Sequence, residues 1–132
     1  MNITIYTPTK KMLTYFNQAI KEYQKRLSKF AKINAKTYKD KNIEKVIKTN
    51  THLIKVSPKG KLISSEKLAQ ELSTLAINGI SDISFILTDK QITHFKHIAL
   101  SKMTISDQLS LVVLFEQIYR SFSINNNMPY HK

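Results

Sequence analysis

The chain has 132 residues, of which 42% are hydrophobic, a size and composition that suit one globular domain spanning 1–132. Lys and Arg number 21 against 9 Asp and Glu, and the resulting formal charge of +12 favours a polyanionic partner, with nucleic acid as the first candidate. The absence of cysteine excludes disulfides and thiolate metal sites, and the four histidines lack a supporting carboxylate spacing, so we expect no metal site.

The first part of the chain predicts a strand followed by a long helix. Residues 2–7 alternate in polarity, which is typical of a strand, and Thr-Pro-Thr at 7–9 closes it. Between Lys10 and Phe30 apolar residues recur every three or four positions, so they form one stripe of a helix. We expect the basic residues on its other faces to form a solvated surface; contact with an RNA backbone is the alternative.

The middle of the chain predicts two further strands. Residues 33–38 and 52–56 have the apolar character of strands. The lysine-rich stretch 39–49 between them predicts a short helix or a loop. Ser57-Pro58-Lys59-Gly60-Lys61 is expected to end the third strand as a loop, because Pro and Gly interrupt regular structure.

The next segment predicts a helix and a buried strand. Ser64 or Ser65 can cap a helix whose leucines share one face, and Asn78-Gly79 ends it. Residues 83–87 form a short apolar run of the fully buried kind. Because strands alternate with helices along the chain, the sequence predicts an α/β fold with a mainly parallel sheet flanked by helices.

A last helix is predicted after an irregular stretch. It begins at Ser106 or Asp107, and its apolar residues between Leu109 and Phe122 are spread too widely for one stripe backed by solvent. Such a helix needs burial on more than one side. Since a chain of this size seldom covers a helix so fully, we expect part of its surface to meet a second copy in a two-fold homodimer.

The place of a ligand site follows from the parallel sheet. Ligands collect outside the carboxyl ends of the strands, which points to the loops at 57–61, 88–90 and 99–103. With Gly60 and Gly79 as its only glycines, the chain has neither a P-loop nor a GxGxxG motif, and no local Ser-His-Asp or Cys-His set indicates a hydrolase. Targeting and membrane-spanning patterns are absent, so we expect a cytoplasmic protein.

The C-terminal region carries the most specific pattern. The run 114–122, Leu-Phe-Glu-Gln-Ile-Tyr-Arg-Ser-Phe, followed by Ile124-Asn125 and Pro129-Tyr130-His131-Lys132, resembles the C-terminus of the RlmH family. That family consists of SPOUT methyltransferases acting on N3 of pseudouridine in large-subunit ribosomal RNA. Further matches extend the resemblance over nearly the whole chain, at 3–5, 19–27, 60–66 and 100–104.

This resemblance implies a fold, a cofactor and partners. The implied fold is a compact SPOUT domain whose C-terminal helix and tail thread a trefoil knot, and the implied assembly is a homodimer. S-adenosyl-L-methionine is the implied methyl donor. The implied substrate is a pseudouridine in a ribosomal RNA stem-loop at the subunit interface of the assembled ribosome.

The resemblance also assigns site residues by motif position. Arg120, Tyr130 and His131 would face the target base, whereas the residues at 130–132 by themselves favour a disordered basic tail. Because N3 of a uracil ring is a weak acid, His131 is a candidate base and Arg120 could stabilise the anion; loss of the proton to bulk water is the alternative. The cofactor would contact Val56, Thr88, Ile98, Ala99, Leu100, Ser101, Lys102 and Met103.

The chain also departs from the family pattern. Leu87-Thr88-Asp89-Lys90-Gln91 replaces a glycine-rich turn that normally forms a cofactor wall, so we expect Thr88 and Asp89 to narrow or reshape the pocket and Asp89 to attract the sulfonium cation. Other departures are Asp107 in place of a histidine, Asn126-Asn127 in place of Arg-Gly, Thr9 in place of an early glycine, and a shorter region between Tyr38 and Thr51.

These departures leave three hypotheses of function. The first is an S-adenosylmethionine-dependent rRNA methyltransferase with a remodelled cofactor loop, supported by Ser101-Lys102-Met103 and the Tyr-His-Lys end. The second is a noncatalytic dimeric relative that binds rRNA or the ribosome after losing the cofactor site, motivated by Thr88-Asp89. The third is a methyltransferase of another RNA, because fold and donor do not fix the acceptor.

Overall fold

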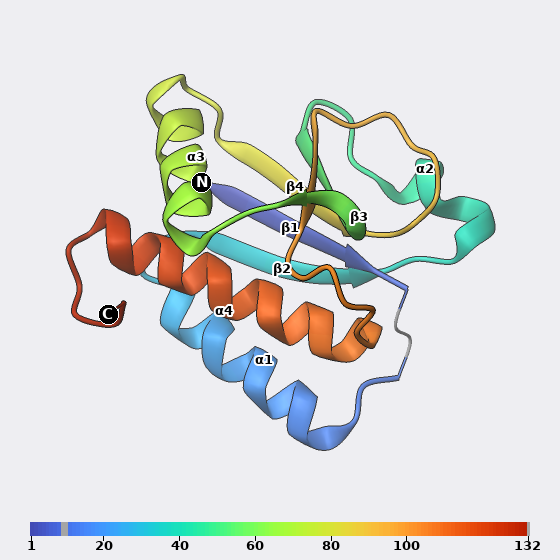
Figure 1. Cartoon of the computed structure of the whole chain (residues 1–132), viewed down its shortest axis with the longest axis horizontal. Helices are drawn as coiled ribbons and strands as arrows, with labels where there is room; N and C mark the ends of the chain where they lie inside the picture. Colours follow the sequence, from blue (N-terminus) through green and yellow to red (C-terminus); the bar gives the residue numbers. More distant parts are fainter. Residues whose placement is uncertain (9–10, 132) are drawn as a thin grey trace.

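Strands and helices alternate along the chain in the computed structural model, which describes residues 1–8 and 11–131 (Figure 1). The strands are β1 (Asn2–Thr7), β2 (Lys32–Thr37), β3 (His52–Leu62), β4 (Asp82–Leu87) and β5 (Lys96–Ala99). The helices are α1 (Thr14–Leu27), α2 (Ile43–Val46), α3 (Ser65–Ile77) and α4 (Asp107–Asn125), with a 3-10 turn, η1 (Asp40–Asn42), before α2.

The described residues build a five-stranded sheet in the order β2-β1-β4-β3-β5. Every neighbouring pair of strands is parallel. The predicted α/β class, with a parallel sheet flanked by helices, is therefore confirmed. Because the strands run the same way, their carboxyl ends gather at one edge of the sheet, where the sequence places a ligand site.

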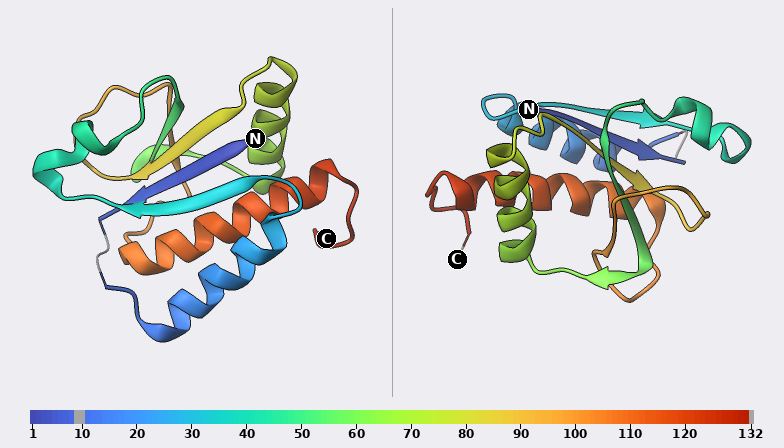
Figure 2. Two further views of the ribbon diagram at one scale, coloured as in Figure 1. Left: turned by 180° about the vertical axis from the view of Figure 1, so that it is seen from behind. Right: turned by 90° about the horizontal axis from the view of Figure 1, so that it is seen from above.

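Successive residues of each strand face opposite sides of the sheet, and both sides are covered. Ile5 and Phe85 lie in the main hydrophobic core with residues of α1, α3 and α4. Tyr6 and Ile86, their neighbours in sequence, lie in a smaller cluster on the other side with Ile43 of α2. Figure 2 shows α1 and α4 lying side by side along the sheet, with α2 at its far end.

Helix α4 is buried on several sides within one chain. It contacts α1, α3 and β4, and Leu114, Phe115 and Ile118 are completely buried. The predicted need for burial on more than one side is thus met without a second copy. Ser106 caps the helix by accepting the backbone N–H of Leu109 at 3.2 Å, and Ser64 caps α3 in the same way through Lys67 at 3.1 Å. The trefoil knot implied by the family resemblance stays a prediction.

Three element boundaries differ from the sequence predictions. The segment 57–61 is part of β3 and not a loop, because a register shift between Val56 and Lys61 accommodates the extra residues as an irregular bulge against β5. Strand β5 replaces a stretch predicted to be irregular. Helix α1 begins at Thr14 and ends at Leu27, so it is shorter than predicted; the predicted start at Lys10 lies outside the described residues.

Among the described residues, no helix combines the length and apolar character that crossing a membrane requires. The same residues contain no group of three or more His, Asp or Glu arranged to hold a metal ion.

Candidate active site

A cavity of about 490 Å³ lies at the carboxyl edge of the sheet. The three loops predicted to converge there, 57–61, 88–90 and 99–103, each contribute to its wall. The start of α4 closes another side. The lining residues are Pro8, Tyr38, Val56, Ser57, Pro58, Lys59, Leu87, Thr88, Asp89, Lys90, Leu100, Ser101, Met103, Thr104, Ile105, Asp107 and Ser110.

The residues assigned to the cofactor divide into lining and supporting groups. Val56, Thr88, Leu100, Ser101 and Met103 line the cavity. Three others do not. Ile98 and Ala99 are buried in β5, and the ammonium group of Lys102 donates to the backbone carbonyls of Pro58, at 3.5 Å, and Gly60. Lys102 thereby links the segment after β5 to the bulge of β3. It supports the cavity wall without lining the cavity.

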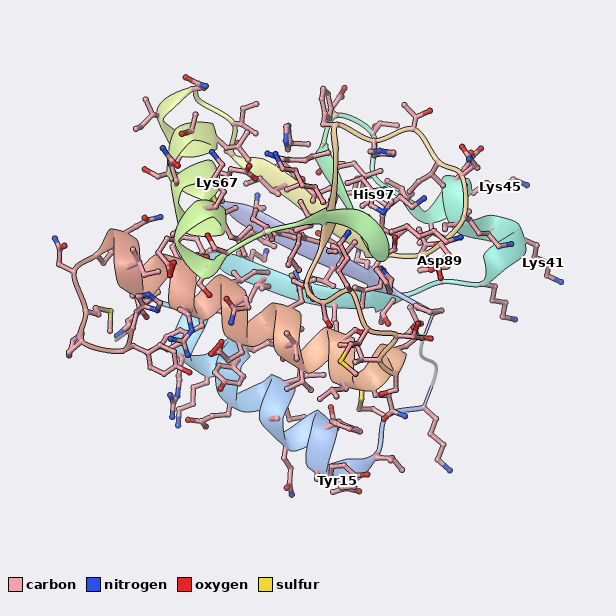
Figure 3. The ribbon with its side chains drawn as sticks, viewed as in Figure 1. Tyr15, Lys41, Lys45, Lys67, Asp89 and His97 are labelled. Atoms are coloured by element: carbon pink, nitrogen blue, oxygen red, sulfur yellow. The ribbon has the colours of Figure 1, made fainter. Side chains whose placement is uncertain are left out.

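The cavity combines apolar walls with charges of both signs. Val56, Leu87 and Leu100 supply apolar surface. Two carboxylates, Asp89 after β4 and Asp107 at the first turn of α4, also line it. Figure 3 shows Asp89 at the end of the molecule that holds η1 and α2. Lys59 and Lys90 line the cavity as well, so its charges of both signs and its apolar sides suit an organic ligand that itself carries both positive and negative groups.

Ser57 and His97 form a hydrogen-bonded pair at the cavity wall that sequence reasoning missed. Ser57 Oγ lies 2.6 Å from Nε2 of His97 and also accepts the backbone N–H of Lys59 at 3.3 Å. Burial lowers the pKa of His97 first, and the nearby charge of Lys55 lowers it further. A neutral imidazole can accept the Ser57 hydroxyl hydrogen through Nε2. Ser57 follows Val56 and His97 precedes Ile98, two positions assigned to the cofactor, but nothing local in the sequence indicates that Ser57 and His97 pair.

The residues assigned to the target base form a second group near the C-terminus. Arg120 Nη1 lies 3.0 Å from Nδ1 of His131. The guanidinium carbon of Arg120 lies 4.9 Å from the ring centroid of Tyr130, a distance typical of a cation–π contact. The structure therefore brings Arg120, Tyr130 and His131 together.

Two glutamates complete this group, and sequence reasoning missed both. Glu116 receives Arg120 Nη2 at 3.0 Å and the Tyr130 hydroxyl at 3.1 Å, and Glu66 of α3 lies 3.0 Å from Nε2 of His131. The hydrogen bond to Glu116 raises the pKa of Arg120. Burial, followed by the hydrogen bond to Tyr23, raises the pKa of Tyr130. The spacing of four between Glu116 and Arg120 was a readable signal, whereas nothing local links Glu66 to the tail.

These contacts fix the tautomer of a neutral His131. An arginine guanidinium can only donate hydrogen bonds, so Nδ1 accepts from Arg120 and must lack a hydrogen. Nε2 then carries the hydrogen and donates it to Glu66. Both ring nitrogens are occupied, and the imidazole can take a proton from a substrate only after Arg120 leaves Nδ1.

Comparison with known proteins adds to this geometry. Residues 1–131 match the model of the family described as "Predicted SPOUT methyltransferase". The chain belongs to the SPOUT methyltransferases. It is 37% identical to ribosomal RNA large subunit methyltransferase H 1 of Thermoanaerobacter sp. (strain X514), over 133 positions and all of both chains. It is 38% identical to ribosomal RNA large subunit methyltransferase H of Latilactobacillus sakei subsp. sakei (strain 23K), over 159 positions and again all of both chains.

A relative of similar length shares the shortness of this SPOUT protein. The alignment with the Thermoanaerobacter relative needs only 133 positions to cover that relative completely, so the relative has the same compact length. Ribosomal RNA large subunit methyltransferase H of Clostridium acetobutylicum, 35% identical, aligns over 159 positions. Because relatives named methyltransferases match from end to end, and one of them is equally short, the comparisons do not favour the noncatalytic alternative.

The two groups of candidate residues lie at opposite ends of α4. Ser110 lines the cavity and Arg120 belongs to the tail group, so ten residues of helix, about 15 Å, separate them. Figure 1 shows the C-terminus at one end of α4, and Figure 3 shows Asp89 toward the other. One copy of this SPOUT chain therefore does not bring its cofactor-facing and base-facing residues together.

Proposed function

We propose that this protein transfers the methyl group of S-adenosyl-L-methionine to N3 of a pseudouridine in large-subunit ribosomal RNA. The observation that carries the proposal is the cavity at the carboxyl edge of the sheet. Its wall includes five of the eight residues assigned to the cofactor by motif position, in a chain that matches its family over residues 1–131. Work on ribosomes would place the protein in the cytoplasm, and residues 1–132 would act as one domain.

The cavity fits the proposed cofactor in size and in chemistry. Its volume of about 490 Å³ falls within the range of small-molecule sites. Val56, Leu87 and Leu100 offer surface to an adenine ring, and Asp89 and Asp107 offer negative charge to the sulfonium and ammonium groups. S-adenosylmethionine would supply an electrophilic methyl group on a sulfonium. The Thr88-Asp89 sequence leaves the cavity open, which supports retention of cofactor binding.

The tail group fits the chemistry of the proposed acceptor. N3 of a uracil ring must lose its hydrogen to become nucleophilic, and the resulting anion is stabilised by a fixed positive charge. Glu116 holds Arg120 in place for that role. His131 would act as the base once a substrate displaces Arg120 from Nδ1; if Arg120 stays in place, the proton would go to water.

We infer that the working enzyme is a homodimer in which the tail of one copy reaches the cavity of the other. The separation along α4 supports this inference, because a second copy placed antiparallel would bring Arg120 to the cavity end. Exposed apolar side chains at that end offer a surface for the second copy: Leu13 and Tyr15 of the α1 region, and Met103 and Leu109 near the start of α4.

Calorimetric titration with S-adenosylmethionine, followed by a methylation assay on purified ribosomes, tests the proposal. We expect micromolar binding, and we expect N3-methylated pseudouridine in nuclease-digested large-subunit rRNA by mass spectrometry. Leu100→Trp, which fills the cavity, should abolish both results. If the folded wild-type protein binds no cofactor up to millimolar concentration, with or without ribosomes, the proposed function is wrong. Methylation of a different nucleoside would retain the enzyme class and overturn the acceptor.

A further inference from the structure

A second cavity of about 280 Å³ lies on the side of the sheet that holds the smaller hydrophobic cluster. It is lined by Ile47, Lys48, Thr51, Leu53, Thr93, His94 and Phe95. The segment 88–95 belongs to both cavities, because its first residues line the cofactor cavity and its last residues line this one. On β3, Val56 lines the cofactor cavity and Leu53 lines the second cavity. These two residues are three positions apart, about 10 Å along the strand.

Phe95 presents an aromatic ring to solvent at this second cavity. Its side chain is 73% exposed, although its backbone is fixed by a hydrogen bond from its N–H to the carbonyl of Leu53 at 2.9 Å. One face of the ring stacks on His52, with the centroids 4.6 Å apart and the planes 11° from parallel. Burial lowers the pKa of His52, which favours the neutral imidazole in this stack. The result is a supported flat aromatic surface beside a hollow.

The charge around the cavity complements a phosphate backbone. Lys48 lines the cavity itself. Figure 3 shows Lys41 and Lys45 projecting from η1 and α2, the elements that directly precede the lining residues Ile47 and Lys48 in the chain. Lys48 lies 3.4 Å from Asp82, which also accepts the Thr51 hydroxyl at 2.7 Å, so the charges of Lys48 and Asp82 partly compensate each other. Glu44, exposed on α2, adds a negative charge next to these lysines, whereas the chain as a whole carries a formal net charge of +12. Cations beside an exposed ring are the pattern of single-stranded nucleic-acid binding.

We propose that this second cavity binds an unpaired nucleotide of RNA, with its base stacked on Phe95 and its phosphate near Lys48 and Lys45. Stacking requires an unpaired base, so the ligand is single-stranded RNA and not a duplex. The inference rests on the proposed function in that the nucleotide would flank the methylated one on the same RNA strand. Segment 88–95 lines both cavities, and the cavities lie close together along β3. Two nucleotides of one RNA strand can therefore reach both cavities.

Binding of a fluorescein-labelled RNA of ten uridines, followed by anisotropy, tests this site. Phe95→Ala should weaken binding by about 5- to 150-fold, because loss of one stacked base costs about 1–3 kcal/mol. Phe95→Trp, which retains a ring, should bind like the wild type. Ile77→Ala is the matched control, because Ile77 is an exposed apolar residue on α3 whose side chain is 81% exposed. Lys45→Ala should weaken binding and reduce its salt dependence.

The outcomes separate this inference from the proposed function. If Phe95→Ala binds the RNA as tightly as the wild type, or Ile77→Ala loses as much affinity, the stacking site is wrong. A wild-type protein that binds S-adenosylmethionine but prefers duplex RNA, or binds no decauridine, overturns the site and leaves the proposed function standing. Selective loss in Phe95→Ala from a protein that binds no cofactor supports the RNA site and overturns the methyltransferase proposal.

Discussion

Ser57 Oγ lies 2.6 Å from Nε2 of His97, across the boundary between β3 and β5 at the wall of the cofactor cavity. The pair orients a hydroxyl that otherwise would rotate freely, and leaves it able to accept a hydrogen bond from a ligand amino or hydroxyl group. We predict that Ser57→Ala weakens binding of S-adenosylmethionine by about 2- to 12-fold, the effect of one net hydrogen bond. Calorimetry measures the change, and Ser81→Ala, an exposed serine before β4, is the control. Equal affinities in Ser57→Ala and the wild type would remove Ser57 from the site.

His97 also links stability to pH. Because burial lowers its pKa in the folded protein, the unfolded chain binds a proton more readily, and folding stability falls as the pH drops below about 6.5 toward that lowered pKa. We predict that His97→Gln loses less stability between pH 7.5 and 5.5 than the wild type, since glutamine does not titrate. Urea unfolding at several pH values tests this, and parallel pH profiles for the two proteins would contradict it.

Gly60 is required by close packing in the bulge of β3. A Cβ atom at this position would lie 2.5 Å from the backbone carbonyl of Ile98 and 2.8 Å from the ring of His97. We predict that Gly60→Ala destabilises the protein by about 1–3 kcal/mol in urea unfolding, the usual cost of overpacking.

Gly79 provides the matched comparison, because its requirement is conformational. Its φ is +79°, and an added Cβ would meet no atom within 4 Å. Asparagine tolerates positive φ better than other non-glycine residues, so Gly79→Asn should cost less than Gly60→Asn. If the two asparagine variants lose the same stability, the packing argument for Gly60 is wrong.

Much of the fold could be predicted from the sequence, because its strongest signals are local. The alternation in β1, the helical stripe of α1 and the serine caps of α3 and α4 lie within short windows. Strand β5 was missed because it has only four residues, two of them half-buried, and so lacks a clear alternation. The bulge was missed because Pro58 and Gly60 indicate a loop until the contact with Ile98 is known.

The residues of the candidate site also divide into those with a local sequence signal and those without one. Residues in motifs, such as Val56 and Arg120, could be assigned from the sequence, and Glu116 lies within one helical turn of Arg120. Glu66 and His97 could not be assigned, because the first meets His131 from another helix and the second meets Ser57 forty positions away. Sequence periodicity carries no information about such long-range pairs.

Arg120 should matter for methyl transfer and not for cofactor binding. It is assigned to the target base, and the cofactor cavity is lined by other residues, so Arg120→Gln should leave the affinity for S-adenosylmethionine unchanged. Loss of a fixed positive charge that stabilises an anion typically lowers the rate by about 100- to 1,000-fold. Single-turnover methylation of ribosomes measures the rate, and calorimetry checks binding. A variant that methylates at the wild-type rate would exclude Arg120 from the chemistry.

Mixed dimers test whether the two groups of residues come from different copies. Arg120→Gln leaves the cavity intact, and Leu100→Trp leaves the tail group intact while filling the cavity. If the tail of one copy serves the cavity of the other, each variant alone is inactive, but a heterodimer of the two pairs one wild-type tail with one wild-type cavity. We therefore predict that co-expressed, differently tagged chains purified as the heterodimer regain activity, up to one working site per dimer. A heterodimer as inactive as its parents would mean that each copy must supply both groups, and the separation of Ser110 and Arg120 along α4 would then have to close by movement within one chain.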